Sequence, residues 1–337
     1  MKQKQRTKNQ HYLPRYRISF FLNKSNNLYI YDMTKNRSRK SGKNDTKFAV
    51  DKNLYEWKKC HRWKKFRGQI ETYLFAQNVE KNDARQLRKI IYYIKYESFK
   101  HNNKLRKEDA NWLGCYTIRM IFRTPLTVKL IKGISKKNPY KFIAMMETLN
   151  SDKQNIIDSE KLNKIRIQSD IYNDGTIILH SALESFILPD KGFVICNPTE
   201  YKSKIIITPL TPSLCAVTAL GKFEELKHRD GEIIATTLDD VEVINQALFF
   251  AAQNEVCSKY SFNPHYIDKI KHQREEFNKR VKSENLYTIT HGKKIYVKRE
   301  KTKKEQNATT SKEIIMSTTT PNEQAFNYKQ YKNTSTK

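Results

Sequence analysis

The first secondary-structure pattern of the chain is strand-like. In NLYIYD, which ends at Asp32, apolar and polar residues alternate as in a half-buried strand. A second strand, KFAV, follows after the polar stretch MTKNRSRKSGKND. The pattern predicts a hairpin of these two strands, whose loop carries five Lys or Arg residues. This loop is consistent both with a solvated connection and with a contact surface.

The next hundred residues show the spacing of helices. Gly and Pro are scarce, and apolar residues recur three or four positions apart in ARQLRKIIYYIKYESF, DANWLGCYTIRMIF and NPYKFIAMMETLN. Glu108 and Asp109 suit the first turn of the second helix, and Pro125 should end or kink it. We therefore predict a helical part over about residues 53–153.

Beyond residue 160, short β-rich runs predict a sheet. KIRIQSDIY and TIILHSAL flank Asp174-Gly175, which favours a tight hairpin turn. SFILP, GFVIC, KIIITPL and LCAVTAL follow, separated by prolines. The run DDVEVINQALFFAAQNEVCSK then predicts an amphipathic helix that closes the sheet, with Asp239 and Asp240 in its first turn.

Together these elements predict an α+β fold. An N-terminal β-hairpin and the helical part are expected to pack on a C-terminal mixed or antiparallel sheet, closed by the late helix. We expect one composite domain over residues 9–285, with its β-rich part at about residues 160–260. Residues 1–8 are expected to form a flexible basic terminus and residues 301–337 a disordered polar tail, while residues 286–300 have the pattern of one more hairpin.

Charge is unevenly distributed along the chain. The sequence has 64 Lys and Arg against 35 Asp and Glu, a net charge of +29. Residues 1–70 contain 20 basic and 4 acidic residues, whereas residues 151–240 contain 10 and 14. A genome-wide compositional bias would act on both segments alike, so the basic N-terminal half predicts a positive field suited to a polyanion. Nucleic acid is the first candidate, and an anionic membrane surface is the second.

The remaining composition predicts a cytoplasmic protein. The number of cysteines is odd and no two are spaced as a C-x-x-C pair, which favours reduced thiols in the core and argues against a metal site. The five cysteines are Cys60, Cys115, Cys196, Cys215 and Cys257. No apolar core of a signal peptide follows the basic N-terminus, and no apolar run is long enough to span a bilayer. We expect no membrane insertion and no cofactor.

The most distinctive motif is QHYLPRY at residues 10–16, followed by ISFFL and the YIYD strand. Five further motifs follow along the chain in this order: KFAVDKNLYEW, IRMIFRTP, GFVICNPTEY, IITPLTPSLCAVTAL and VINQALFFAAQNEVCSK. With these motifs the chain resembles, over roughly residues 9–260, the bacterial family catalogued as domain of unknown function 4238. The activity of that family is unassigned, so the resemblance implies no catalytic residue. Related chains tend to have Ser-Asp-Asn-Pro where this chain has Ile195-Cys196-Asn197-Pro198, which puts in doubt any activity that depends on that Asp.

The N-terminal motif also contains a candidate anion site. Pro14 suits the first turn of a helix, and the free amides of a helix N-terminus favour a phosphate near His11, Arg15 and Arg17. With an unperturbed pKa of about 6.5, His11 is suited to act as a general acid or base. A purely structural role, in which His11 pins the N-terminal segment to the body, explains the motif as well.

Further candidates lie at a helix end and a strand end. Arg119 and Arg123 are four residues apart and can either fork onto phosphates or pair with buried acids such as Glu71 or Glu147. Asn197 suits a turn, at a loop tip where polar function tends to concentrate. The candidate catalytic residues are His11, Arg15, Arg123 and Asn197.

The run WKKCHRWKKFR at residues 57–67 interleaves three aromatic side chains with six Lys or Arg. Base stacking and phosphate contacts use these residue types, although helical spacing also allows the Trp residues to be core and the cations to be solvated. The candidate nucleic-acid-binding residues are Arg17, Arg37, Arg39, Lys40, Lys58, Lys59, Arg62, Lys64, Lys65, Arg67 and Arg119.

Missing motifs narrow the functions. The chain has no P-loop, G-x-G-x-x-G, H-E-x-x-H, G-x-S-x-G or kinase signature, so the reactions that depend on them have no support. Three hypotheses remain. The protein acts on nucleic acid, at most as a metal-independent nuclease; it binds nucleic acid without catalysis; or its basic face meets an acidic protein partner as an interaction or sensing component of a stress or defence system.

Overall fold

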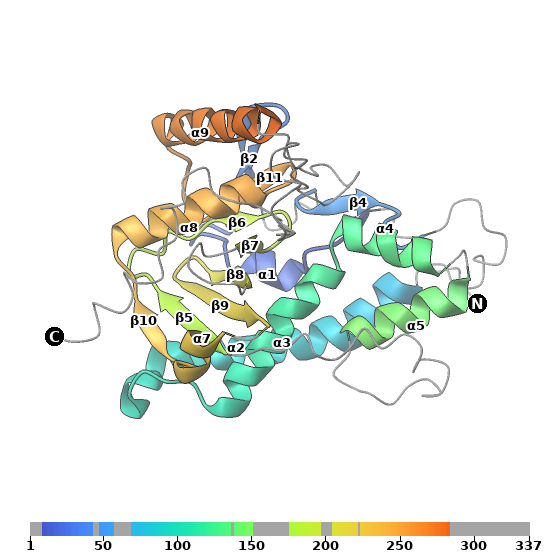
Figure 1. The fold of residues 1–337 in the computed structure, drawn as a ribbon, viewed down its shortest axis with the longest axis horizontal. Coiled ribbons are helices and arrows are strands. Elements are labelled where there is room, and N and C mark those ends of the chain that lie inside the picture. Colours follow the sequence, from blue (N-terminus) through green and yellow to red (C-terminus); the bar gives the residue numbers. More distant parts are fainter. Residues whose placement is uncertain are drawn as a thin grey trace, which may run out of the picture.

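The computed structural model describes residues 9–42, 47–56, 69–135, 138–150, 175–196, 204–221 and 223–283 (Figure 1). It confirms the expected α+β fold. The expected terminus 1–8, hairpin 286–300 and tail 301–337 lie outside the described residues, as does the aromatic-basic run 57–67. The helices are α1 (Arg15–Ser19), η2 (Gln69–Val79), α2 (Glu80–Tyr96), η3 (Ser98–His101), α3 (Lys107–Phe122), α4 (Pro125–Ile134), α5 (Pro139–Asn150), α7 (Glu224–His228), α8 (Leu238–Ala251) and α9 (Pro264–Ser283).

A five-stranded sheet lies at the centre of the fold, in the order β10-β5-β9-β8-β7. Its neighbouring strands are antiparallel except for β10 and β5, which are parallel. The expected hairpin partner of β5, KIRIQSDIY, lies outside the described residues, and β5 has β9 and β10 as its neighbours. The strands are β5 (Thr176–His180), β7 (Val194–Cys196), β8 (Lys204–Thr211), β9 (Leu214–Leu220) and β10 (Ile233–Ala235).

Helices cover both faces of this sheet. Along β5, Ile177 and Leu179 pack in one core cluster with α8, whereas Ile178 packs in another cluster with α2 and α3. Figure 1 shows α8 above the sheet and α2 and α3 below it. Because successive side chains of a strand point to opposite faces, burial on both faces produces the continuous hydrophobic runs seen in the sequence. The inner face of α2 therefore belongs to the core.

The N-terminal hairpin forms with a different second strand from the one expected. β2 (Asn27–Asp32) pairs antiparallel with β3 (Arg37–Gly42), whose sequence RSRKSG was assigned to the loop. The KFAV segment contributes only its last residue to β4 (Val50–Lys52), which pairs with β1 (Asn9–His11). β3 is the edge of a four-stranded sheet in the order β3, β2, β11 (Glu255–Ser258) and β6 (Leu188–Pro189), and its charged side chains discourage pairing with another chain. Because β3 is polar, hydrophobic alternation does not reveal it.

The late helix is shorter than expected. α8 ends at Ala251, and the EVCS segment forms β11 (Glu255–Ser258) between β2 and β6 (Leu188–Pro189). The buried carboxylate of Asp190 accepts a hydrogen bond from the backbone N–H of Gln253 at 2.8 Å and from those of the next two residues. This carboxylate stabilises the turn that ends the helix and starts the strand.

A proline and a glycine shape two boundaries of the fold. Pro125 ends α3 and is the first residue of α4, whose N-cap Thr124 accepts a hydrogen bond from the backbone N–H of Thr127 at 3.4 Å. Gly175 precedes β5 with φ +130°, and a Cβ there would collide with the carbonyl oxygen of Leu226 in α7. The chain enters the sheet by a route that only glycine takes without strain.

The last described helix, α9, is one that the hydrophobic pattern did not predict. It is 20 residues long and polar, and it packs Ile267 and Ile270 into the cluster that contains α8. None of the helices in the described part of the chain combines the length and apolar character that crossing a membrane requires.

Candidate functional site

The N-terminal motif and the residue that follows it contain three basic side chains, which lie in different environments. His11 is buried in β1, Arg15 is exposed, and Arg17 is fully buried. Arg17 donates one hydrogen bond to the hydroxyl of Tyr116 at 3.0 Å and another to the carbonyl of Pro209. The Arg17 guanidinium, a candidate contact for nucleic acid, therefore joins α1 to α3 and β8.

Arg119 and Arg123 are buried on α3 and bind carboxylates of α2. The Nη2 atom of Arg119 lies 2.9 Å from Oδ1 of Asp83, and Arg123 pairs with Glu80. The guanidinium of Arg123 also lies 4.0 Å from the ring centroid of Phe75. The sequence left open whether these arginines bind phosphates or pair with buried acids. In the structure they form ion pairs within the protein, with Asp83 and Glu80 in place of the suggested Glu71 and Glu147.

The charges of these pairs are strongly coupled. Burial raises the pKa of Asp83, although Arg119 and Arg123 favour its ionised form. Burial is the largest single influence and opposes the charge of Arg123, but Glu80, Tyr55 and Tyr16 together outweigh it, so the pKa of Arg123 is raised. Both guanidiniums are therefore charged groups held between helices, and removing one partner would leave an uncompensated charge.

Three of the candidate catalytic residues influence the carboxyl group of Glu71. Glu71 lies in η2, a π-helix continuous with α2. Burial raises the pKa of Glu71 to about 7, although Arg123, the backbone N–H of His11 and Arg15 favour the carboxylate. Its Oε2 atom is buried and has no hydrogen-bond partner among the described residues. A carboxyl group that ionises near neutral pH is suited to proton transfer.

The other candidates fall into separate places. Asn197 lies outside the described residues. On the edge strand β3, Arg37 and Lys40 are exposed, and Arg39 forms an ion pair with Glu255 at 3.2 Å. Within the described ranges, no group of three or more His, Cys, Asp or Glu is placed to hold a metal ion. Six of the candidate nucleic-acid-binding residues lie outside the described residues, namely Lys58, Lys59, Arg62, Lys64, Lys65 and Arg67.

An exposed stripe of cations and tyrosines, here called the outer face of α2, has no counterpart among the predicted sites. The rings of Tyr92 and Tyr96 are 58% and 59% exposed, and their centroids lie 4.9 Å apart. The cations of the stripe form no ion pair with any other residue that the structure describes. The outer face of α2 consists of Arg85, Arg88, Lys89, Tyr92 and Tyr96.

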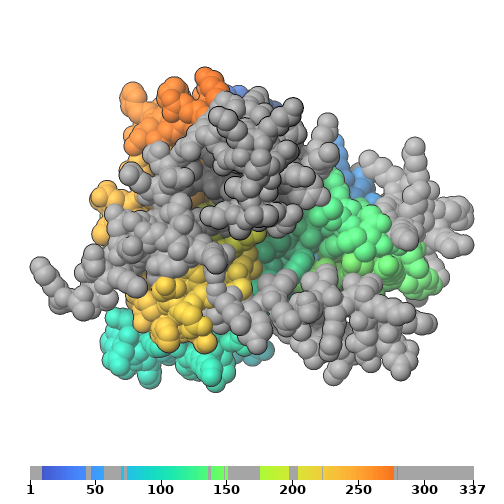
Figure 2. Space-filling view, viewed as in Figure 1, coloured from blue at the N-terminus to red at the C-terminus, as the bar shows by residue number. Residues whose placement is uncertain are grey.

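The surroundings of this stripe are basic as well. From Lys81 to Glu108, nine exposed Lys and Arg side chains stand against two exposed Glu. Figure 2 shows the surface of the segment that joins α2 to α3 in teal, at the lower edge of the molecule. Leu87, Ile90 and Ile94 on the opposite face of α2 are buried. The helix is therefore apolar inside and positively charged outside.

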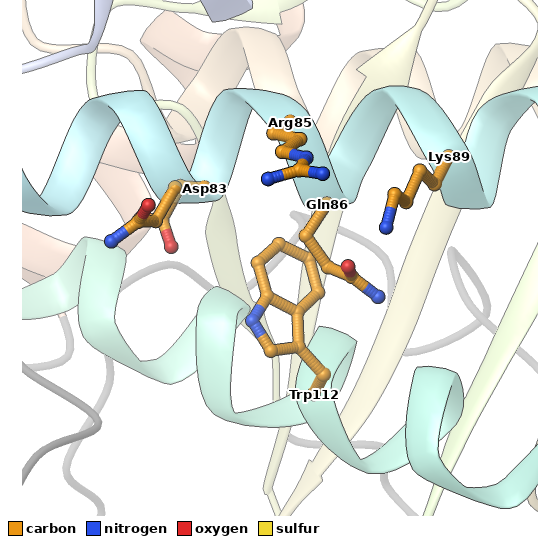
Figure 3. Close-up of a pocket in the computed structure, with 6 residues that line it drawn as sticks. Asp83, Arg85, Gln86, Lys89 and Trp112 are labelled. Carbon is orange, nitrogen blue, oxygen red and sulfur yellow. The ribbon is translucent and has the colours of Figure 1, made fainter.

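Two neighbouring hollows lie along α2 and share Lys89. The first, here called the Trp112 pocket, has a volume of about 340 Å³ and lies between α2 and α3 (Figure 3). The second, of about 440 Å³, lies where Tyr92 and Tyr93 approach Arg106 at the start of α3. Figure 3 shows the indole of Trp112 reaching from α3 toward α2. The Trp112 pocket is lined by Asn82, Asp83, Arg85, Gln86, Lys89 and Trp112.

The sequence contained a signal for this surface. In ARQLRKIIYYIKYESF the apolar positions predict the buried face of a helix, and the positions between them carry the cations and the exposed tyrosines at helical spacing. The pattern predicts the helix, but several other basic segments of the chain look equally suited to bind a polyanion.

Comparisons with known proteins add nothing to this geometry. No protein-family model, curated protein or solved structure matches the chain.

Proposed function

We propose that the protein binds single-stranded nucleic acid along the outer face of α2. The observation that carries this proposal is the stripe in which three exposed cations are followed by two exposed tyrosines. Cations supply phosphate contacts, and exposed aromatic rings supply planes on which unpaired bases stack. The bases of a duplex are already stacked on one another, so the tyrosines would contribute little to binding a duplex.

A membrane surface explains the stripe less well. A helix that binds lipid inserts its apolar face into the bilayer. In α2 that face is occupied, because Leu87, Ile90 and Ile94 pack with α3 and the sheet in the protein core. The residues that face outward are suited to a flexible polyanion.

Fluorescence anisotropy with a labelled single strand, measured over a range of salt concentrations, tests the proposal. Each phosphate contact of a single strand contributes about −0.7 to the slope of log affinity against log salt, so three cations predict a slope of about −2. Arg85→Ala/Lys89→Ala should reduce its magnitude by about 1.4. Tyr92→Ala/Tyr96→Ala should weaken binding at least about fivefold and leave the slope unchanged, because stacking contributes about 1–3 kcal/mol per base.

A charge-matched variant provides the control. Lys227→Ala/Lys269→Ala removes the same charge from α7 and α9, at side chains that are 56% and 59% exposed. We expect its slope to equal that of the unmodified protein. Equal weakening by both double variants would mean that net charge alone drives binding, and would reject the stripe. A pull-down that resists nuclease and recovers one acidic protein would favour a protein partner instead.

A second candidate function is metal-independent strand cleavage, and the position of Glu71 favours it. Glu71 ionises near neutral pH under the influence of Arg123, and its Oε2 atom has no hydrogen-bond partner among the described residues. In this candidate, Glu71 replaces His11 as the acid or base. Incubation of labelled RNA in chelator should give cleavage that Glu71→Gln abolishes and His11→Asn retains. Intact RNA after incubation with the unmodified protein would eliminate this candidate.

We also propose a cytoplasmic location and membership in the family that the motifs resemble. Cys115, Cys196, Cys215 and Cys257 are free thiols, and the last three are buried, which suits a reducing compartment. The family motifs meet in space: the YIYD strand β2 pairs with β11 of the last motif, and Arg17, which directly follows the first motif, bonds Pro209.

A further inference from the structure

We infer that the Trp112 pocket binds a nucleobase that carries a phosphate, either a base of the bound strand or a free nucleotide. The inference rests on the proposed function, because the pocket and the outer face of α2 share Arg85 and Lys89. It assigns to the pocket what the stripe alone does not provide, which is a hollow between two helices that can hold one base.

The indole of Trp112 forms a fixed plane in this pocket. The ring of Tyr116 stacks on it, with centroids 5.1 Å apart and an interplanar angle of 13°. The hydroxyl of Tyr116 in turn accepts hydrogen bonds from Tyr16 and from Arg17, both at 3.0 Å. Trp112 itself is only half-buried, so part of its ring is open to the pocket. A ring that is already oriented loses little entropy when a base stacks on it.

The buried charge beside the indole is balanced. The guanidinium of Arg119 lies 5.8 Å from the centroid of Trp112 and is held by Asp83 at 2.9 Å. Because cation and carboxylate neutralise each other, this side of the pocket neither attracts nor repels an uncharged ring.

The polar groups at the rim suit the edge of a base. Gln86 donates through Nε2 to Oδ1 of Asp109 at 2.9 Å, and Arg106 donates to Oδ2 of the same carboxylate at 2.9 Å. Asp109 is thereby neutralised, and the amide of Gln86 is oriented while its Oε1 atom remains an acceptor. The exposed amide of Asn82 adds both donors and an acceptor.

Two cations complete the pocket. Arg85 and Lys89 are one helical turn apart, both are exposed, and neither forms an ion pair with another described residue. Figure 3 shows them along the α2 edge, beside the indole. The volume of about 340 Å³ falls within the range of small-molecule sites, about 300–1,000 Å³. An aromatic plane, oriented amides and unneutralised cations together suit a planar heterocycle joined to a phosphate.

Tryptophan fluorescence provides a direct test. The chain has three tryptophans, so Trp57→Phe/Trp63→Phe leaves Trp112 as the reporter. We expect saturable quenching by AMP and by CMP, and none by ribose 5-phosphate or inorganic phosphate at the same concentrations. Equal responses to AMP and to ribose 5-phosphate would overturn the inference, because the pocket would then recognise the phosphate without the base.

Calorimetry on the otherwise unmodified chain provides a second measurement, in case the double tryptophan variant does not fold. Trp112→Ala should weaken AMP binding at least about fivefold, since a stacked base contributes about 1–3 kcal/mol. Tyr140→Ala removes a 61% exposed ring from α5 and should leave AMP binding unchanged. Unchanged AMP binding in Trp112→Ala would reject the pocket.

The experiments distinguish a base of the strand from a free nucleotide, and they also distinguish failure of the pocket from failure of the proposed function. If AMP displaces a labelled strand, a base of the strand occupies the pocket; if AMP binds without displacing it, the pocket takes a free nucleotide. Either result supports the inference. AMP binding without any salt-dependent strand binding would reject the proposed function and keep the pocket, whereas strand binding without AMP binding would reject the pocket alone.

Discussion

Replacing Glu71 by glutamine should change how the stability of the protein depends on pH. Burial in the folded protein raises the pKa of Glu71 from 4.5 to about 7. Below pH 4.5 the carboxyl is protonated in the folded and the unfolded chain alike, and its favourable contribution is complete. As the pH rises from 4.5 through 7, the unfolded chain releases this proton more readily than the folded protein does, so the contribution is lost.

The size of the effect follows from the same values. The pKa difference between 4.5 and about 7, at about 1.4 kcal/mol per pH unit, gives an upper limit of about 3 kcal/mol, which solvent contact reduces. This value already includes Arg123, Arg15 and the N–H of His11, which favour the carboxylate, and Glu80, which opposes it. Glutamine keeps the size of the side chain and does not ionise. At pH 5 the variant should resemble the unmodified protein in stability, and at pH 8 it should be the more stable of the two.

Urea unfolding at several pH values between 5 and 8.5 measures this difference. Subtracting the two free energies of unfolding at each pH cancels the other titrating groups, which both proteins share. Glu275→Gln, at an exposed carboxylate of α9, serves as the control, and its pH-dependent difference should be smaller than that of Glu71→Gln. If the difference for Glu71→Gln stayed constant to within about 0.5 kcal/mol over this range, the folded protein would not hold the proton as reasoned.

Two further substitutions test burial and backbone conformation. Arg123→Met should lower the free energy of unfolding by about 3 kcal/mol or more, because Glu80 would lose its partner, whereas Lys269→Met, which breaks an exposed 2.8 Å pair with Glu242, should change it by less than about 0.5 kcal/mol. Equal losses in urea unfolding would contradict this reasoning. Gly175→Ala should lower the melting temperature by several degrees, roughly what a loss of 1–3 kcal/mol causes, and an unchanged melting temperature would show that the backbone adapts.

The elements that could be predicted from the sequence are those whose secondary structure is determined by their own residues rather than by the segments they contact. TIILH and KIIITPL are rich in β-branched residues, and both coincide with strands. The strand RSRKSG could not be predicted, because it forms at a sheet edge through backbone hydrogen bonds and exposes its side chains. The EVCS segment continued an apolar pattern that looked helical, and only its pairing with β2 and β6 makes it a strand.

The candidate site was harder to predict, because spacing alone does not tell an inward arginine from an outward one. Arg119 and Arg123 are four residues apart on α3, as Arg85 and Lys89 are on α2. The first two point into the protein, where carboxylates of α2 bind them, and the second two point outward. Which of them are buried depends on the helix that packs alongside, and this information is not local to either segment.

Helix α2 carries carboxylates on the side that faces α3 and cations on its outer face, so the buried ion pairs and the exposed cations belong to the same helix. Glu80 and Asp83 bind the guanidiniums of α3, so these carboxylates do not offset the field of Arg85 and Lys89 on the outer face. Asp83 also lines the Trp112 pocket. The ion pair between Arg119 and Asp83, which holds α2 against α3, therefore also positions the walls of the pocket. It follows that a substitution at Arg119, which holds Asp83 beside the indole, should alter binding at the outer face through the position of α2.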